Sequence, residues 1–198
     1  MRLPGGRGFV PFRGVRPCQR ARRKASAASR RDHSVAGPQY QRQGHLGGDQ
    51  CLFPRQAVAD VRTGKVLYYT YVAHGKGSGG KYATRFSNTP GTNASSLGVY
   101  LTGHTYYGKH GYSLRLKGLN PEYNGAAYRR DIVMHSAWYV SRTFAKDHGR
   151  MGRSWGCVAL SRKVESAVVK LIRGGTVLLA YYPDAKWLRS SPFLRLPR

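Results

Sequence analysis

The stretch Lys65-Val-Leu-Tyr-Tyr-Thr-Tyr-Val72 is the clearest structural signal in the chain, because every residue after the lysine is β-branched, aromatic or aliphatic. Such residues favour β-strands, and an uncharged run of this kind is typical of a strand buried on both faces. The glycine-rich residues 75–80 then break the pattern, as expected for a turn. The sequence therefore predicts a central strand over residues 65–72.

Segments of the same strand-like character follow, separated by Gly, Pro and Asn turns. They lie at residues 97–102, 112–116, 130–134 and 176–182. Two other segments have helical spacing instead. Residues 161–173 place Ser161 as N-cap and Gly174 as the stop, and residues 138–148 end at Gly149. We expect a mainly β domain with two short helices.

The composition bounds the classes of protein that the chain can represent. It has 198 residues, with 34 Lys and Arg against 8 Asp and Glu, so its formal net charge is +26. A content of 40% hydrophobic and 12% aromatic residues excludes a protamine-like polycation. No run approaches the roughly 20 apolar residues that a transmembrane helix needs. The chain suits one folded domain of ordinary size with basic extensions.

The basic residues and the apolar residues are unevenly distributed. Residues 1–56 hold 12 Lys and Arg, 2 acidic residues and only nine Leu, Val and Phe, a composition typical of disordered segments. They contain no apolar core of a secretory signal. We therefore divide the chain into a basic, disordered segment (1–56), a folded domain (57–188) and a basic tail (189–198).

The densest chemistry lies in Gly149-Arg-Met-Gly-Arg153-Ser154-Trp155-Gly156-Cys157, between the two predicted helices. A nucleophilic cysteine needs exposure, a positive environment and a base. Gly156 permits a tight turn that brings peptide N–H groups near the sulfur, and Arg150 and Arg153 supply positive potential. The competing interpretation is a small buried cysteine without chemistry, which is the commoner case for a single cysteine.

His135 is the preferred base among seven histidines, because it follows the apolar residues Ile132-Val-Met134 and a rigid strand end would present it. A hydrogen-bonded structural histidine is the alternative. No two histidines have the i, i+2 or i, i+4 spacing that usually anchors a catalytic zinc, so we expect no metal.

The residues around His135 and Cys157 resemble the catalytic signature of L,D-transpeptidases of the YkuD-like class, and most closely its murein L,D-transpeptidase catalytic-domain branch. Ile132-Val-Met-His-Ser-Ala137 is followed, twenty-two residues after the histidine, by the cysteine of Ser154-Trp-Gly-Cys157. The other blocks, in order, are V-A-H-G-K-G-S-G (72–79), A-T-R-F-S-N (83–88), S-S-L-G-V-Y (95–100), T-Y-Y-G-K-H-G-Y-S-L-R-L (105–116) and G-R-M-G-R-S-W-G-C (149–157). The likeness covers about residues 57–188.

The resemblance implies a β-sandwich-like catalytic domain that acts on peptidoglycan tetrapeptide stems without a cofactor. Cys157 would attack the peptide bond after the third residue, and D-Ala would leave. His135 would be the general base and acid, and the carbonyl of Ser136 would orient its ring. Backbone N–H groups at Trp155 and Gly156 would form the oxyanion hole, and a side-chain amine of a neighbouring stem would receive the acyl group.

We further expect His110, Arg153 and Ser154 to contact the substrate. The resemblance places the protein in the periplasm or cell envelope, although the chain shows no signal peptide. The branch normally has such a signal and more strands before residue 64, whereas residues 1–56 are Arg-rich and featureless. This difference motivates the hypothesis that residues 1–56 arise from a wrong start or a shifted reading frame. Most of the wider class has a histidine two residues before the cysteine, where this chain has Trp155. The closer branch also has a tryptophan there.

Two other functions remain open at this point. An L,D-carboxypeptidase would hydrolyse the same acyl-enzyme with water, and the sequence does not separate water from an amine as acceptor. A basic nucleic-acid-binding protein would use the net charge and the 14 tyrosines, which could stack on bases, and would owe nothing to Cys157. Because of this resemblance we expect no nucleic-acid partner. The oligomeric state stays open.

Overall fold

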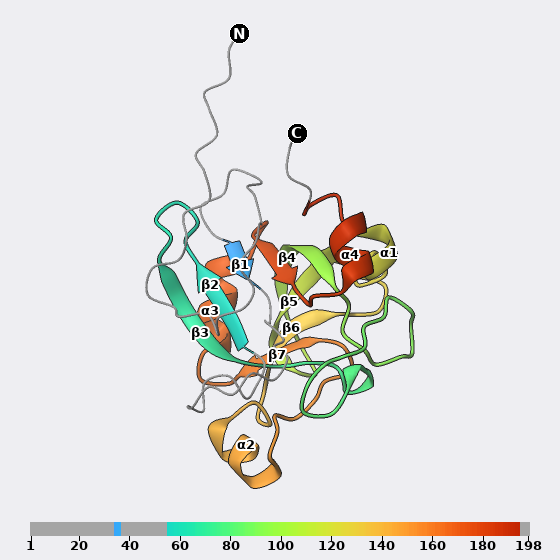
Figure 1. Cartoon of the computed structure of the whole chain (residues 1–198). Helices are drawn as coiled ribbons and strands as arrows, with labels where there is room; N and C mark the ends of the chain where they lie inside the picture. The colour runs from blue at the N-terminus through green and yellow to red at the C-terminus, as the bar shows by residue number, and fades with distance from the viewer. Residues whose placement is uncertain (1–33, 37–54, 195–198) are drawn as a thin grey trace.

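Strands dominate the computed structural model, which describes residues 34–36 and 55–194 (Figure 1). The strands are β1 (Ser34–Ala36), β2 (Arg55–Ala59), β3 (Val66–Ala73), β4 (Gly98–Gly108), β5 (Gly111–Gly118), β6 (Val133–Ala137), β7 (Val158–Ser161) and β8 (Val177–Ala180). The helices are α1 (Pro121–Asn124), α2 (Arg142–His148), α3 (Glu165–Ile172) and α4 (Ala185–Ser190), with a 3₁₀ turn at η2 (Lys76–Ser78). The sheet therefore forms the body of the domain.

Strands β2 to β8 form one curled sheet, and β1 completes it between β2 and β8. The order around the sheet is β1-β2-β3-β7-β6-β5-β4-β8. Most neighbours are antiparallel, but β6 and β7 run parallel, as do β1 and β8. A parallel pair needs a long crossover connection. The crossover from β6 to β7 spans residues 138–157, and it carries α2 and the segment that ends at Cys157.

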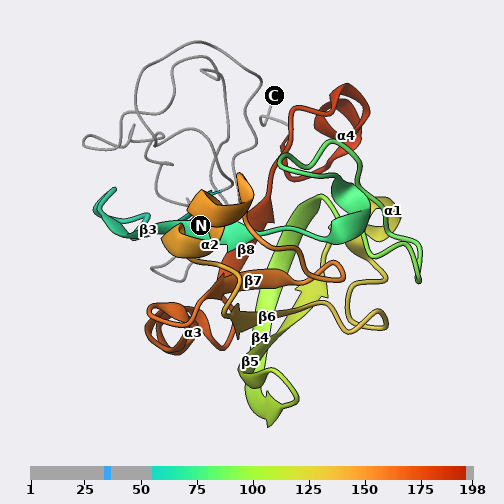
Figure 2. The same cartoon turned by 90° about the horizontal axis from the view of Figure 1, so that it is seen from below.

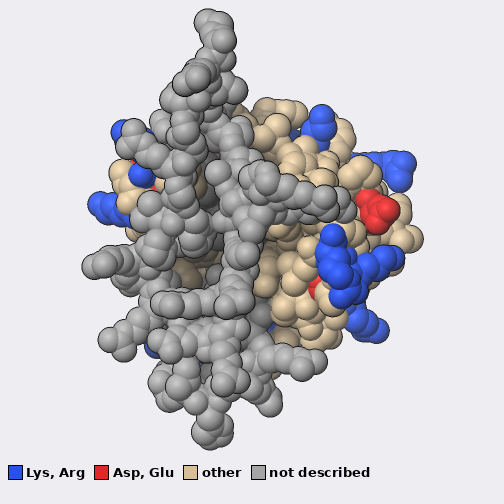
Figure 3. All heavy atoms as spheres, turned by 45° about the horizontal axis from the view of Figure 1, so that its top comes forward, with Lys and Arg blue, Asp and Glu red and all other residues tan. Residues whose placement is uncertain are grey.

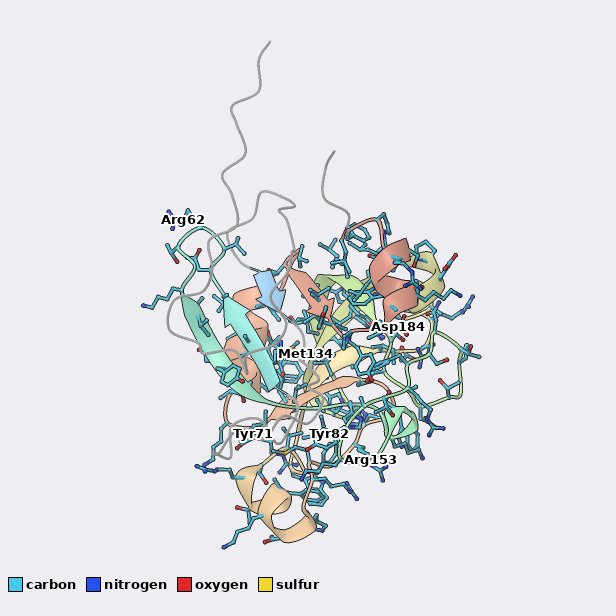
Figure 4. The ribbon with its side chains drawn as sticks, viewed as in Figure 1. Arg62, Tyr71, Tyr82, Met134, Arg153 and Asp184 are labelled. Carbon is cyan, nitrogen blue, oxygen red and sulfur yellow. The ribbon has the colours of Figure 1, made fainter. Side chains whose placement is uncertain are left out.

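The main core lies inside the curl of the sheet and extends under α3. Helix α3 contributes Val168, Val169 and Ile172, all fully buried, and packs beside β5 and β6. Strand residues complete the cluster, among them Val72, Tyr100, Leu114, Leu116, Met134, Leu160 and Leu178. Met134 lies among the strands in Figure 4. This burial holds β6, and with it His135, in a rigid frame.

A second, smaller core fixes α2 to the end of the sheet. Its buried members are Ala73, Ala137, Val140, Ala145, Met151 and Ala159. Figure 1 shows α2 standing away from the sheet at its lower end, and Figures 1 and 2 show α1 and α4 next to each other at another side. The cluster joins the ends of β3, β6 and β7 to α2, so it also anchors the chain that follows α2 toward Cys157.

The predicted mainly β class is confirmed, and the sheet curls so that its walls face each other across the core. Both predicted helices exist as α2 and α3, but they begin later, with Ser141 and Val164 as N-caps. Helices α1 and α4 and strand β7 were not predicted, because they are too short to show a period. The expectation that residues 65–72 are buried on both faces is wrong, since Tyr69 is 51% exposed. The sheet has a solvent-facing side there.

The predicted division of the chain stays a prediction. Strand β1 and the first two residues of β2 fall inside the basic segment 1–56, and the rest of that segment lies outside the described residues. Helix α4 continues through Ser190 into the predicted tail 189–198, and the hydroxyl of Ser191 accepts a hydrogen bond from Asn120. Residues 195–198 lie outside the described part.

The described surface is basic, and Figure 3 shows blue Lys and Arg side chains with little red between them on the face it presents. Residues 57–198 carry 22 basic and 6 acidic side chains. Within the described ranges, no helix is long and apolar enough to cross a membrane.

Candidate active site

The segment that leads to Cys157 is fastened to the chain after β3 by a short parallel ladder. The Ser154 N–H donates to the His74 carbonyl at 2.9 Å, and the Lys76 N–H donates to the Ser154 carbonyl at 2.8 Å. Upstream, the Gly152 N–H donates to the Tyr139 carbonyl at 3.0 Å. We call residues 152–157 the Cys157 loop. The three hydrogen bonds hold this loop against η2 and against the chain just before α2.

Two glycines make this close approach possible. A Cβ on Gly75 would lie 2.3 Å from the Asn93 carbonyl oxygen and 2.9 Å from the Gly156 Cα, distances that no real side chain tolerates. Gly156 has φ +117°, a conformation open to glycine, and its Cβ would meet the Ile132 side chain at 2.8 Å. The backbone of the loop therefore packs directly on the backbone of residue 75.

Ser154 is part of the internal structure of the loop. Its hydroxyl donates to the Cys157 carbonyl at 2.7 Å and accepts from the Gly156 N–H at 3.2 Å. The side chain is buried. The expected contact between Ser154 and substrate stays a prediction; in this structure the hydroxyl shapes the turn before Cys157.

The Cys157 sulfur lies at the start of β7, partly buried. Its thiol donates to the Asp131 carbonyl with an Sγ···O distance of 3.5 Å. Burial raises the pKa of Cys157, the Asp131 charge adds to this, and the Val133 amide and the Arg130 guanidinium oppose it. A raised pKa means a neutral thiol at neutral pH, so attack on a substrate requires a base.

Asp131 reaches this position through an unusual backbone. It has φ 52°, in the left-handed region that Asp and Asn tolerate better than most residues. Arg115 Nη1 donates to Asp131 Oδ1 at 2.6 Å, and the Arg115 guanidinium lies 4.5 Å from the centre of the Tyr106 ring. The ion pair therefore holds the turn that points the Asp131 carbonyl at the sulfur.

Arg130 ties the same turn to a different part of the chain. Its guanidinium donates to the Ser87 carbonyl at 2.7 Å, to the Ser96 hydroxyl at 2.6 Å and to the Ala94 carbonyl at 2.8 Å. Burial lowers the pKa of Arg130, but an arginine stays charged. It is thus a fixed, partly buried positive charge close enough to lower the pKa of Cys157.

His135 is buried, with 3% of its surface exposed. Its Nδ1 lies 2.8 Å from the Ser136 carbonyl, which only accepts, so Nδ1 carries the proton and Nε2 is the basic nitrogen. Burial lowers the pKa of His135 below its ordinary 6.5; the Ser136 bond opposes this and the charge of His110 adds to it. His135 is therefore a neutral base at neutral pH.

The parallel register brings His135 close to the segment that ends at Cys157. His135 lies opposite Ala159 on β7, and Cys157 precedes Ala159 by two positions, directly before that strand. Because side chains two apart in an extended chain point to the same side, continuing β7 by one residue would place Cys157 on the face that carries His135. Twenty-two residues separate the two along the sequence, and the β6–β7 pairing shortens that separation to two positions of the ladder.

His110 lies on top of His135. The two rings stack with their centres 4.4 Å apart and an angle of 22° between their planes. His110 sits in the tight turn between β4 and β5, and it is exposed. Burial and then the charge of Lys109 lower the pKa of His110. It is thus placed between solvent and the buried base.

A family model of the L,D-transpeptidase catalytic domain matches residues 50–181 of the chain. The chain belongs to this family. The resemblance inferred from the sequence motifs is therefore confirmed. A comparison with curated proteins finds no match.

Solved structures of L,D-transpeptidases are similar to this family member over part of their length. One from Mycobacterium smegmatis is 14% identical with a TM-score of 0.41, covering 65% of this chain and 54% of that one. One from Stackebrandtia nassauensis is 13% identical with a TM-score of 0.45, covering 79% of this chain and 58% of that one. The chain thus spans little more than half the length of these proteins.

In this L,D-transpeptidase domain the structure brings several of the predicted site residues together. His135 and Ser136 lie on β6, Cys157 lies directly before the paired strand β7, and His110 stacks on His135 from the β4–β5 turn. Trp155 is 68% exposed, with Lys76 Nζ 5.1 Å from its ring centre. Arg153 Nη1 donates to the Gly79 carbonyl at 3.0 Å, and Figure 4 shows Arg153 on the α2 side.

Sequence reasoning missed Arg130 and Asp131, which shape the surroundings of the sulfur. They were assigned to a strand over residues 130–134, whereas β6 begins at Val133. The sequence offers one signal for them, a pair of opposite charges directly before an apolar strand. Such a pair is too common to indicate a functional site. Within the described part of the chain, no group of three His, Cys, Asp or Glu side chains is placed to hold a metal.

A small, partly open cavity of about 20 Å³ lies next to Cys157, lined in part by His74, Ser95 and Tyr100. That volume suffices for about one water molecule. The His74 Nδ1 lies 2.9 Å from the Gly75 carbonyl, and burial lowers the pKa of His74. This cavity is thus too small to hold a peptide substrate.

Proposed function

We propose that this protein is a cysteine acyltransferase that carries out L,D-transpeptidation of peptidoglycan stem peptides through an acyl-enzyme on Cys157. The observation that supports the proposal is the parallel β6–β7 register, which sets His135 opposite Ala159, two residues after Cys157, while burial raises the pKa of the thiol and lowers that of the imidazole. The Ser136 carbonyl supports the tautomer that leaves Nε2 of His135 free to accept the thiol proton.

The chemistry follows from these protonation states. His135 Nε2 takes the proton from Cys157 as Sγ attacks the carbonyl carbon of the third stem residue, forming a tetrahedral oxyanion. The imidazolium then gives this proton to the amide nitrogen of the departing D-Ala, and the C–N bond breaks. A side-chain amine of a second stem attacks the thioester, passes a proton to His135 and releases the Cys157 thiolate, which recovers a proton.

The turn before Cys157 supplies the groups for the oxyanion. Backbone N–H donors from Trp155 to Cys157 are proposed to bind the developing charge. The Gly156 N–H already donates to Ser154 at 3.2 Å, so it contributes only if that long bond gives way. The fixed charge of Arg130 favours negative charge on the sulfur. These donors are preorganised because the ladder to residues 74–76 holds the loop.

His110 and Arg153 are proposed to contact the stem peptide. His110 is exposed above His135, on the side from which substrate would approach, and Arg153 lies one residue from Ser154 on the opposite flank. Members of this family act on the cell wall, and we propose the cell envelope as the site of action. The basic surface suits a carboxylate-bearing polymer.

Intact mass spectrometry after exposure to a carbapenem tests the proposal, because this drug class acylates the nucleophile of such enzymes. The full-length wild-type protein should gain one acyl mass, and peptide mapping should place it on Cys157. The Cys157→Ala variant retains Cys18 and Cys51 as internal controls and should gain none. Acylation of that variant, or of another cysteine, would refute the mechanism.

Product analysis separates the two acyl acceptors. Incubation of the wild type with the tetrapeptide stem should yield cross-linked dimer and free D-Ala. Tripeptide and D-Ala without dimer would show an L,D-carboxypeptidase. Salt-sensitive binding of DNA or RNA that is unchanged in Cys157→Ala, without any acylation, would instead support the nucleic-acid-binding alternative.

A further inference from the structure

A second concave surface lies beside the Cys157 loop, between η2, the start of the β6–β7 crossover and α2. It is an open groove of about 250 Å³. Its lining side chains are Lys76, Trp138, Tyr139, Phe144, Arg150 and Arg153. The mechanism above uses none of these residues in bond making, and only Arg153 was proposed as a substrate contact. We call this surface the α2 groove.

The α2 groove combines positive charge with aromatic surface. Among the residues that the structure describes, none of those lining it is acidic. Arg150 Nη1 donates to the Met151 carbonyl at 3.0 Å, which fixes the guanidinium. An arginine has five N–H donors, so one such bond leaves others for a ligand. Groups of this kind recognise carboxylates through charge-assisted hydrogen bonds.

Trp138 is the aromatic centre of the α2 groove. It is 62% exposed, which is unusual for so large an apolar ring. Its orientation is fixed by edge-on contacts, with ring centres 5.9 Å from Tyr139 and 5.5 Å from Phe144. A preorganised and exposed aromatic ring beside fixed cations is typical of a recognition surface rather than of a core.

The α2 groove lies close to Cys157 along the chain, and its residue Tyr139 lies within reach of the Cys157 charge. Arg153 follows the groove residue Gly152, and the chain reaches Cys157 four residues later. Tyr139 lines the groove, and its pKa is raised to about 12, first by burial and then by the charge of Cys157. A stem peptide bound to Cys157 can therefore extend into the groove.

We propose that the α2 groove binds free carboxylates of the stem peptide, with Arg150 as the main carboxylate partner and Trp138 as the apolar contact. The identity of this ligand rests on the proposed function. The groove is smaller than the roughly 300–1,000 Å³ of pockets for drug-sized ligands, so it suits one or two amino-acid residues rather than a whole glycopeptide.

Calorimetric binding of the synthetic tetrapeptide stem to the full-length Cys157→Ala protein tests the assignment without turnover. Adding Arg150→Gln should weaken binding about five- to tenfold, because the charged hydrogen bond that is lost lies in an open groove where solvent screens it. Adding Trp138→Ala should have an effect of the same order. Adding Arg162→Gln makes the same charge change at an exposed residue outside the groove, and should alter affinity less than about twofold.

A peptide with amidated carboxyl groups sharpens this test as a double-mutant cycle. Amidation should weaken binding to the Cys157→Ala protein and have little additional effect once Arg150 is Gln. The proposal would be overturned if the Arg150→Gln and Arg162→Gln proteins bound the stem equally well, or if no stem binding were seen at all. It would also be overturned if amidation weakened binding to the Arg150→Gln protein as much as it weakens binding to the protein that keeps Arg150. Equally tight binding of the glycan disaccharide without its peptide would overturn it too.

The two proposals fail in different ways. Were the catalytic proposal wrong, wild-type Cys157 would resist carbapenem acylation while the binding differences at Arg150 and Trp138 persisted. Were the groove assignment wrong, acylation would proceed as expected and the binding of the groove variants would match that of the Arg162→Gln control. Thermal unfolding of each variant shows that an altered affinity does not come from loss of folded protein.

Discussion

The Cys157 loop and the α2 groove share a stretch of chain but differ in almost every physical respect. In the loop, Ser154 and the facing His135 are buried and hydrogen-bonded to backbone carbonyls. In the groove, Trp138 is exposed, and its ring is oriented only by edge-on contacts with Tyr139 and Phe144. The residues proposed to react are therefore held in a buried frame by bonds to the backbone, whereas the proposed recognition surface consists of side chains at the surface.

This difference has a consequence for mutation. A change in the buried frame disturbs several hydrogen bonds or a close contact at once, so it should reduce the reaction rate or the folded population. A change in the groove removes one exposed side chain and should alter binding with the fold intact. The four predictions below concern the buried frame and the residues that flank it, from the largest expected effect to the smallest.

His135→Ala should slow acylation of Cys157 by about 10² to 10⁴, the usual effect of losing a general base. The measurement is the rate of carbapenem acylation followed by mass, with thermal unfolding as a check on folding. His148→Ala is the matched control, because His148 is exposed, stacks on Phe144 and should cost less than about tenfold. If His148→Ala were the more damaging change, the base would be misassigned.

Gly75→Ala should lower the free energy of unfolding by about 1–3 kcal/mol and reduce acylation, because the new methyl group would collide with Asn93 and Gly156. Thermal or urea unfolding measures the first effect. Gly80→Ala is the matched control in the same glycine-rich segment, since a Cβ there has nothing within 4 Å. Equal stability of the two variants would show that the loop does not pack on Gly75.

His110→Ala should shift the low-pH limb of the acylation rate toward higher pH. His135 must be neutral to act, so the rate falls as pH drops through its pKa, which lies below 6.5. Removing His110 exposes the His135 ring and removes a neighbouring positive charge, and both changes raise the pKa of His135. A pH profile measures the shift, with exposed His104→Ala as control. If the low-pH limb did not move, His110 would not influence the pKa of His135.

Asp131→Asn should give the smallest effect, a less than tenfold rise in the alkylation rate of Cys157 near neutral pH. Asparagine tolerates the left-handed backbone of residue 131, while the lost negative charge lowers the pKa of the thiol. The pH dependence of iodoacetamide alkylation measures the change, and Asp147→Asn on the exposed side of α2 is the control. A higher midpoint in the Asn variant would contradict the electrostatic account.

Much of the fold could be predicted from local patterns, because strands β3, β4, β5 and β8 each have a β-branched or aromatic run. Helix α2 was predicted from its spacing and from Gly149, although it begins only at Arg142, where the Ser141 hydroxyl accepts the Phe144 N–H at 3.1 Å. Strand β7 was missed, because Val158–Ser161 is too short to show alternation. Its place was determined by pairing with β6.

The candidate site was predictable in part. Residue types and the motif point to Cys157 and His135 as the candidate catalytic residues. The motif also predicts that the Ser136 carbonyl orients the His135 ring, and Nδ1 of His135 lies 2.8 Å from that carbonyl. The substrate contact expected of Ser154 stays a prediction, and the bonds of its hydroxyl to the Cys157 carbonyl and the Gly156 N–H were not predicted, because sequence shows a hydroxyl but not its partners. Arg130 and Asp131 were missed for the same reason: their roles depend on contacts with Ala94, Ser96 and the sulfur, which are remote in the chain.

By itself the sequence determined the mainly β class, the family and the two residues proposed to carry the chemistry, because strand-forming runs and catalytic motifs are local in the chain. Only the tertiary structure decided how the segments that hold these residues are arranged. The parallel β6–β7 pairing aligns His135 with the strand that follows Cys157, and burial raises the pKa of the thiol and lowers that of the imidazole. The α2 groove likewise exists only because the crossover folds Trp138 and Arg150 onto one surface, an arrangement set by packing between distant segments rather than by sequence spacing.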